Sequence, residues 1–142
     1  MTSIYLIRHG EAEGNLYRRA QGQFEADITA KGHRQIAALA ERFRNVHIDA
    51  LYSSDLRRTR ITAGAITKYH ELPMNLEPRL REVCLGTWED EPWGNLSHDF
   101  PEAMTAFNDD PDAWTAPRAE SFQQLGKRMT EAVLDIAAAH DG

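Results

Sequence analysis

The stretch "LIRHGEAEGN" (residues 6–15) decides the predicted fold, because in it an apolar run ends in a group of polar side chains. Residues 4–7 are all apolar, which is the pattern of a short β-strand buried on both faces. Arg8 and His9 follow directly, and Gly10 follows them. In parallel α/β sheets, ligands bind outside the carboxyl ends of the strands. We therefore predict a strand over residues 4–7 with a ligand site at its end.

Helix and strand patterns alternate after this stretch. Thr29 can cap a helix whose apolar side chains recur at intervals of three and four residues up to Phe43. Residues 48–54 are predicted as a second strand, a helix follows to about Tyr69, and residues 74–77 are a short third strand. This alternation predicts an α/β fold in which a mostly parallel sheet is flanked by helices.

The last third of the chain differs in character. Residues 85–117 hold all three tryptophans and four of the six prolines. The prolines interrupt any helix, but the segment is too rich in aromatic residues to be a disordered linker. We predict an irregular, ordered cover over the active site, with the tryptophans as packing residues, within a single domain over residues 1–142. Beyond the cover, Ser121 and Gln124 fit a capping box that opens an amphipathic helix.

Composition and charge exclude several classes of protein. The net charge of −6 argues against nucleic-acid binding, which depends on clustered Lys and Arg. We find no apolar run long enough to span a membrane and no leader pattern, so we expect no membrane contact and a cytoplasmic location. The single Cys84 excludes an internal disulfide, and motifs for zinc hydrolysis or P-loop nucleotide binding are absent. We expect no metal ion and no cofactor.

Three polar clusters follow the three predicted strands. Each combines cationic or nucleophilic side chains with a carboxylate: Arg8, His9, Glu11 and Asn15; Ser53, Ser54, Asp55, Arg57 and Arg58; Arg79, Arg81 and Glu82. Arginine binds phosphate oxygens through two parallel hydrogen bonds, and nearby guanidinium groups lower the pKa of a histidine and keep it nucleophilic. A carboxyl group can protonate the leaving alkoxide and later accept a proton from water. The clusters therefore favour phosphoryl transfer.

Other interpretations of single residues stay open at this point. His9 could be a structural histidine, and Glu82 could form an ion pair with Arg79 or Arg81. Glu11 is a second candidate acid, although we expect it to orient loop arginines instead.

Six ordered blocks of the sequence resemble the histidine phosphatase superfamily, the phosphoglycerate mutase-like enzymes, and resemble its phosphatase branch more than its mutases. The blocks are "LIRHGEAEGN" (6–15), "RAQG" (19–22), "ITAKGHRQ" (28–35), "LYSSDLRRTRITA" (51–63), "RLREVCLGTWED" (79–90) and "ESF" (120–122). The resemblance implies that His9 is the phosphorylated nucleophile and that Arg8 and Arg58 bind the phosphate. It further implies that Asn15 lines the same pocket, that Gln21 and Gly22 lie near the substrate, and that Glu82 is the general acid.

Helical geometry agrees with the choice of Arg58. Adjacent helical positions point about 100° apart, so only one of Arg57 and Arg58 can readily face the strand end. We expect Arg57 and Arg60 to be exposed.

The resemblance also implies parts that the chain lacks. Family members carry a second essential histidine in a Ser-His-Gly turn after the strand that follows the "ESF" helix, and no Ser-His-Gly occurs in these 142 residues. We therefore expect the fold to be incomplete at its C-terminus, with one or more strands missing and an uncovered sheet edge that invites oligomerisation. The expected function is hydrolysis of a small phosphomonoester through phosphohistidine, with the 142-residue form weak or inactive. The alternatives are mutase-type phosphoryl transfer and a phosphate-binding or regulatory module.

Overall fold

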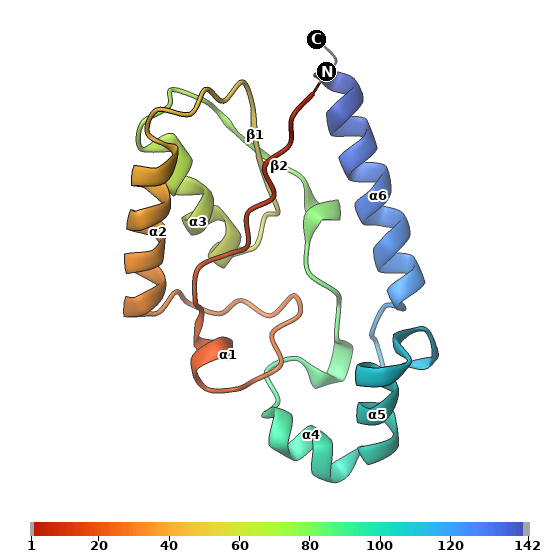
Figure 1. The fold of residues 1–142 in the computed structure, drawn as a ribbon. Coiled ribbons are helices and arrows are strands. Elements are labelled where there is room, and N and C mark those ends of the chain that lie inside the picture. Colours follow the sequence, from red (N-terminus) through yellow and green to blue (C-terminus); the bar gives the residue numbers. More distant parts are fainter. Residues whose placement is uncertain (1, 141–142) are drawn as a thin grey trace. The chain divides into compact units, whose positions relative to one another are not determined.

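The computed structural model describes residues 2–140, and Figure 1 shows their helices and strands. Helix and strand alternate from residue 30 to residue 80, and the elements after that are helical. The elements are α1 (Glu13–Leu16), α2 (Ala30–Phe43), β1 (Leu51–Ser53), α3 (Arg57–Thr67), β2 (Met74–Leu76), η1 (Pro78–Leu80), η2 (Gly86–Trp88), α4 (Trp93–Asp99), α5 (Pro101–Asp109), η3 (Pro111–Ala113) and α6 (Phe122–Ala139).

The chain divides into two compact units, which we describe separately. The first, called the sheet unit, contains both strands together with α1, α2 and α3, and comprises residues 7–16 and 25–81. The second, called the α6 unit, contains α4, α5 and α6, and comprises the described residues within 1–6, 17–24 and 82–142.

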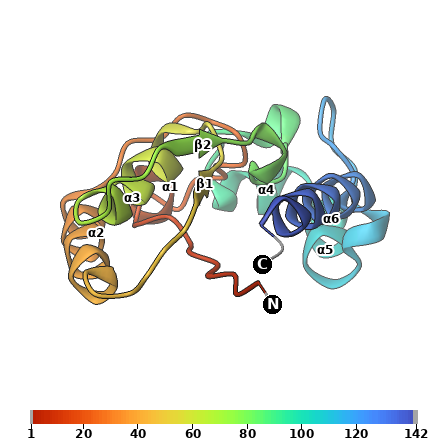
Figure 2. The same ribbon diagram turned by 90° about the horizontal axis from the view of Figure 1, so that it is seen from above.

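In the sheet unit, β1 and β2 pair in parallel with Leu51 opposite Met74. Helices α2 and α3 lie side by side, as Figures 1 and 2 show from two directions. Phe43 from α2, Leu51 from β1 and Ile66 from α3 form a buried cluster that holds these elements together. The structure confirms the predicted parallel pairing and the two flanking helices.

The N-terminus of α2 forms as predicted. The Thr29 hydroxyl accepts a hydrogen bond from the Gly32 N–H at 3.0 Å and so satisfies one of the amide groups that a helix start leaves unpaired.

In the α6 unit, aromatic side chains form the core. The Trp114 ring lies 5.2 Å from Trp88, 5.3 Å from Phe107 and 5.8 Å from Phe122, measured between centroids. Trp88 and Trp114 are 2% and 1% exposed, which confirms their predicted role in packing. Short helices and 3₁₀ turns make up residues 86–113, in agreement with the predicted interruptions.

The predicted capping box at the start of α6 is also present. The Ser121 hydroxyl accepts from the Gln124 N–H at 3.1 Å, and the Gln124 side chain accepts from the Ser121 N–H at 2.8 Å.

The predicted strand over residues 4–7 is wrong. These residues form no strand, and the sheet of the described residues consists of β1 and β2 alone. The apolar side chains are exposed, up to 85% at Leu6. A strand exists only where a neighbouring strand pairs with its backbone, and within residues 2–140 no strand or isolated bridge includes this segment.

None of the helices in residues 2–140 has the length and apolar character needed to cross a membrane.

Candidate active site

A cavity of about 510 Å³ lies within the sheet unit and brings three predicted site residues together. Arg8, His9 and Asn15 line it together with the polar residues Glu11, Gln35 and Thr62, and its apolar side chains come from residue 7 and helix α2. An anion that enters this cavity meets one guanidinium group, one imidazole, two carboxamides and a hydroxyl, and also the Glu11 carboxylate.

The orientation of His9 suits a nucleophile. Its Nδ1 lies 2.7 Å from the carbonyl oxygen of Gly10. A carbonyl oxygen can only accept a hydrogen bond, so Nδ1 carries the proton, and in the neutral ring Nε2 carries the lone pair. The hydrogen bond therefore selects the tautomer in which Nε2 can attack an electrophile.

Side chains of α2 and α3 fix the loop that carries His9. The Gly10 N–H donates to the Thr62 hydroxyl at 2.9 Å, and the Glu11 N–H donates to the Gln35 side-chain oxygen at 2.8 Å. These contacts replace the strand that the sequence predicted as the rigid support of His9.

Gly10 packs tightly against α2. A Cβ atom at this position would lie 3.1 Å from the Gly32 carbonyl oxygen and 3.2 Å from the Ile36 side chain. The tight contact is therefore with helix α2.

Asn15 lies in α1 and supports its own turn. Its side-chain oxygen accepts from the Ala12 N–H at 3.0 Å, so the amide NH₂ is the group that can donate to an anion.

Arg57 and Arg60 are exposed, as predicted, whereas Arg58 is buried at the start of α3. The Arg58 side chain is 1% exposed and does not belong to the cavity lining. Thr62 connects the Arg58 backbone to the His9 loop. Its hydroxyl donates to the Arg58 carbonyl oxygen at 2.8 Å and accepts from the Gly10 N–H.

The expected role of Glu11 is wrong. Its carboxylate accepts from the Thr29 hydroxyl at 2.8 Å and lies 3.4 Å from the Lys31 ammonium, so it orients the start of α2 and no loop arginine. The Thr29 hydroxyl lowers the pKa of Glu11 below its usual value, and Lys31 acts in the same direction against the opposing effect of partial burial.

The α6 unit holds the other three predicted site residues, Gln21, Gly22 and Glu82. Glu82 is exposed, and its carboxylate accepts from the Val83 N–H at 3.1 Å. Of the two arginines considered as ion-pair partners of Glu82, Arg79 pairs with Glu77 at 2.9 Å and Arg81 pairs with Asp55 at 2.6 Å.

Gly22 has a structural requirement of its own. Its φ is +49°, and a Cβ atom would lie 2.7 Å from a Glu89 carboxylate oxygen and 2.8 Å from the Val83 carbonyl oxygen. The neighbouring Gln21 side-chain oxygen is buried without a hydrogen-bond partner among the residues that the structure describes.

Several supporting residues escaped the sequence analysis. Thr62 follows Arg58 by four residues and so lies on the same face of the helix. This spacing could have predicted that Thr62 lies near the candidate site. Glu120 begins the "ESF" block, but nothing in the sequence connects Glu120 or Arg128 with Glu82, whose loop they hold.

Comparison with known proteins gives a family match over nearly the whole chain. The sequence model of the histidine phosphatase superfamily (branch 1) matches residues 4–142. A probable phosphoglycerate mutase, GpmB, of Yersinia pestis (strain Pestoides F) is 38% identical over 135 residues, which are 95% of this chain and 62% of that protein. The chain therefore spans less than two thirds of that relative's length.

Solved structures show the same fold. Bacillus stearothermophilus YhfR superimposes with a TM-score of 0.90 and 32% identity, over 95% of this chain and 67% of that one. A mycobacterial glucosyl-3-phosphoglycerate phosphatase gives a TM-score of 0.84 and 30% identity, over 93% of this chain and 65% of that one. These matches confirm the predicted α/β fold.

Proposed function

We propose, because this chain belongs to the histidine phosphatase superfamily (branch 1), that it hydrolyses a small phosphomonoester through a phosphohistidine at His9. The observation that carries the proposal is the hydrogen bond from His9 Nδ1 to the Gly10 carbonyl oxygen on the wall of the cavity. It presents Nε2 as the nucleophile in a cavity that Arg8 also lines.

In the first step, His9 Nε2 forms a bond to phosphorus and the bond from phosphorus to the ester oxygen breaks. The guanidinium groups of Arg8 and Arg58 neutralise the charge on the phosphoryl oxygens. The Glu82 carboxylic acid gives its proton to the departing alkoxide, which leaves as an alcohol.

In the second step, water attacks the phosphorus of phosphohistidine. The Glu82 carboxylate accepts a proton from the water, inorganic phosphate forms, and His9 Nε2 regains its lone pair. Covalent catalysis thus divides one displacement into two easier ones.

The direct test traps the intermediate. The protein is mixed briefly with a ³²P-labelled aryl phosphate, quenched in alkali and digested, and we expect acid-labile radioactivity on the peptide that contains His9. His9→Ala should abolish both the label and the turnover while it leaves the far-ultraviolet circular dichroism spectrum unchanged.

His33→Ala is the matched control, because His33 is an exposed histidine on α2 outside the cavity lining. It should label like the unaltered protein. Phosphatase turnover without label on His9, or label that survives His9→Ala, would contradict the proposal.

We also propose that the 142-residue chain alone turns over slowly. It spans 62% of the GpmB relative, and the second histidine that the family resemblance implies has no Ser-His-Gly counterpart in the sequence. The trapping experiment suits this case, since it requires one phosphorylation event and no repeated turnover.

Mutase-type transfer is the second candidate, because the curated relative bears the name of a phosphoglycerate mutase. The same labelled protein distinguishes the two. Transfer of the label to added phosphoglycerate favours a mutase, release as inorganic phosphate favours a phosphatase, and absence of label favours a binding or regulatory module.

A further inference from the structure

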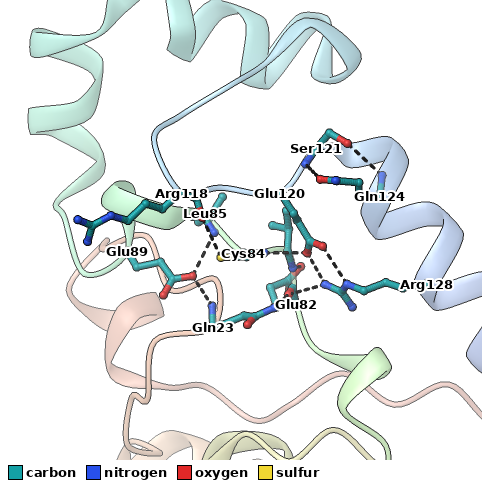
Figure 3. Close-up of polar contacts among 11 residues, drawn as sticks. Gln23, Glu82, Cys84, Leu85, Glu89, Arg118, Glu120, Ser121, Gln124 and Arg128 are labelled. Atoms are coloured by element: carbon teal, nitrogen blue, oxygen red, sulfur yellow. Dashed lines mark hydrogen bonds and ion pairs between the residues drawn. The ribbon is translucent and has the colours of Figure 1, made fainter.

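The segment from Glu82 to Leu85 has no helix or strand of its own and is held by side chains from other segments of the α6 unit (Figure 3). The Glu82 carbonyl oxygen accepts from an Arg128 Nη at 2.9 Å and from the Gln23 Nε2 at 3.2 Å. The direction in which the Glu82 side chain leaves the backbone is therefore set at this carbonyl group.

A second contact fixes the same segment two residues later. The Cys84 N–H donates to the Glu120 carboxylate at 2.9 Å. The Leu85 N–H donates in turn to the Glu89 carboxylate at 3.1 Å, and Glu89 also accepts from the Gln23 N–H at 2.8 Å. Backbone polar groups on both sides of Val83 are thus bound by side chains.

Arg128 and Glu120 bind each other as well as the loop. The Arg128 Nε donates to one Glu120 oxygen at 3.0 Å, and an Arg128 Nη donates to the other. The two side chains are only 19% and 16% exposed, so they are little screened by water. The planar guanidinium group can make both contacts and still reach the Glu82 carbonyl, which a lysine ammonium cannot do in this geometry.

Glu120 is ionised in this arrangement. Burial raises the pKa of Glu120, whereas the hydrogen bonds from Arg128 and from the Cys84 N–H lower it. The lowering effects together outweigh burial, so the pKa of Glu120 lies below its usual value.

We propose that Arg128, held by Glu120, is a positioning residue for Glu82: it fixes the Glu82 carbonyl group and thereby the direction of the carboxyl group that protonates the leaving group. This inference rests on the proposed function. A general acid contributes only when its proton lies within hydrogen-bond reach of the leaving oxygen. The exposed Glu82 carboxylate accepts a hydrogen bond from the Val83 N–H of its own loop, so the position of that loop sets where the carboxylate lies.

The leaving group provides the readout. A nitrophenolate leaves without a proton, whereas an alkoxide needs one, so loss of the acid slows the phosphorylation of His9 by an alkyl phosphate more than by a nitrophenyl phosphate. The variant Glu82→Gln removes the acid and so shows the largest difference to be expected between the loss of rate with the alkyl phosphate and the loss with the nitrophenyl phosphate. We expect Arg128→Met to reduce the rate with the alkyl phosphate roughly tenfold more than the rate with the nitrophenyl phosphate.

Lys127→Met is the matched control. It removes the same charge from the neighbouring position of α6, where the side chain is 78% exposed, and should leave both rates unchanged. Arg128→Lys keeps the charge opposite Glu120 and should show the same selective loss to a smaller extent. It decides the question if Arg128→Met does not fold.

Each outcome has a definite meaning. Equal loss with both substrates, or no loss, in a folded Arg128 variant overturns the positioning role while the proposed function stands. Failure of the unaltered protein to label His9 with either substrate overturns the proposed function, and the positioning role with it.

Discussion

The Thr62 hydroxyl uses both its donor and its acceptor to join two segments of the sheet unit. It donates to the Arg58 carbonyl oxygen at 2.8 Å and accepts from the Gly10 N–H at 2.9 Å, and the residue is 4% exposed. Gly10 in turn provides the carbonyl oxygen that orients His9. One buried hydroxyl therefore links the helix that carries a candidate phosphate ligand to the loop that carries the candidate nucleophile.

Replacing Thr62 by valine keeps the shape of the side chain and removes the hydroxyl. The buried Gly10 N–H then has no acceptor, which should lower the free energy of unfolding by about 1–3 kcal/mol and slow the phosphorylation of His9. Thr62→Ser keeps the hydroxyl and should recover most of the phosphorylation rate. Urea unfolding and the trapping experiment measure the two effects.

Thr67→Val is the control on the same helix, because the Thr67 hydroxyl donates only to the Gly64 carbonyl one turn earlier. It should change stability and phosphorylation little. Equal phosphorylation rates in Thr62→Val and Thr62→Ser would show that the hydroxyl does not support the site.

Among the helices and strands, sequence patterns correctly predicted the features that depend on contacts between residues close in the sequence. The caps at Thr29 and Ser121 and the apolar faces of α2 and α6 depend on residues within a turn or two, and both helices form as predicted. The strand over residues 4–7 depends on a partner elsewhere in the chain, so apolar character alone could not predict it.

In the candidate site, too, short-range features were predicted from the sequence and long-range contacts were not. Arg8, His9 and Asn15 are close in sequence, and the cavity brings them together. The contact between Gly10 and Thr62, which holds the His9 loop, joins residues far apart in the sequence. The contact between Glu120 and Arg128, which holds the Glu82 loop, follows no sequence pattern. Such contacts follow from tertiary packing, which a motif does not encode.

The capping box gives a prediction for α6. Ser121→Ala removes the acceptor for the Gln124 N–H and should lower the free energy of unfolding by about 1 kcal/mol. Tryptophan fluorescence in urea measures it well, since Phe122 at the start of α6 packs against Trp114. Thr130→Ala, at an exposed interior position of the same helix, should be neutral or slightly stabilising. A loss in Thr130→Ala as large as in Ser121→Ala would contradict the assignment to the cap.

At the scale of the whole molecule, the two units differ in how acid should affect them. Among the described residues, the carboxylates with a lowered pKa lie mostly in the sheet unit, where Glu11, Glu41, Asp55 and Glu77 each bind a hydroxyl or a cation, while Glu120 lies in the α6 unit. All three tryptophans belong to the α6 unit. Fluorescence therefore follows the α6 unit, and circular dichroism follows both.

Asp55 and Arg81 provide the sharpest test of this acid dependence. Arg81 donates to both Asp55 oxygens at 2.6 Å, and this hydrogen bonding lowers the pKa of Asp55 below its usual value. A carboxyl group whose pKa is lowered in the folded state stabilises fully above its unfolded pKa of about 4, and this contribution is lost as the pH falls through the folded pKa. Asp55→Asn should therefore reduce stability near neutral pH, by on the order of 1 kcal/mol for a pair that is about one third exposed.

In acid the difference should disappear, because the unaltered protein then loses the same charge. Urea unfolding followed by circular dichroism at about pH 7 and about pH 3 compares the two forms directly. Asp49→Asn removes the same charge from a side chain that is 81% exposed and should behave like the unaltered protein at both values. If Asp55→Asn is equally destabilising at both pH values, the ionised pair is not its cause, and the loss must come from the changed packing between residue 55 and the Arg81 side chain.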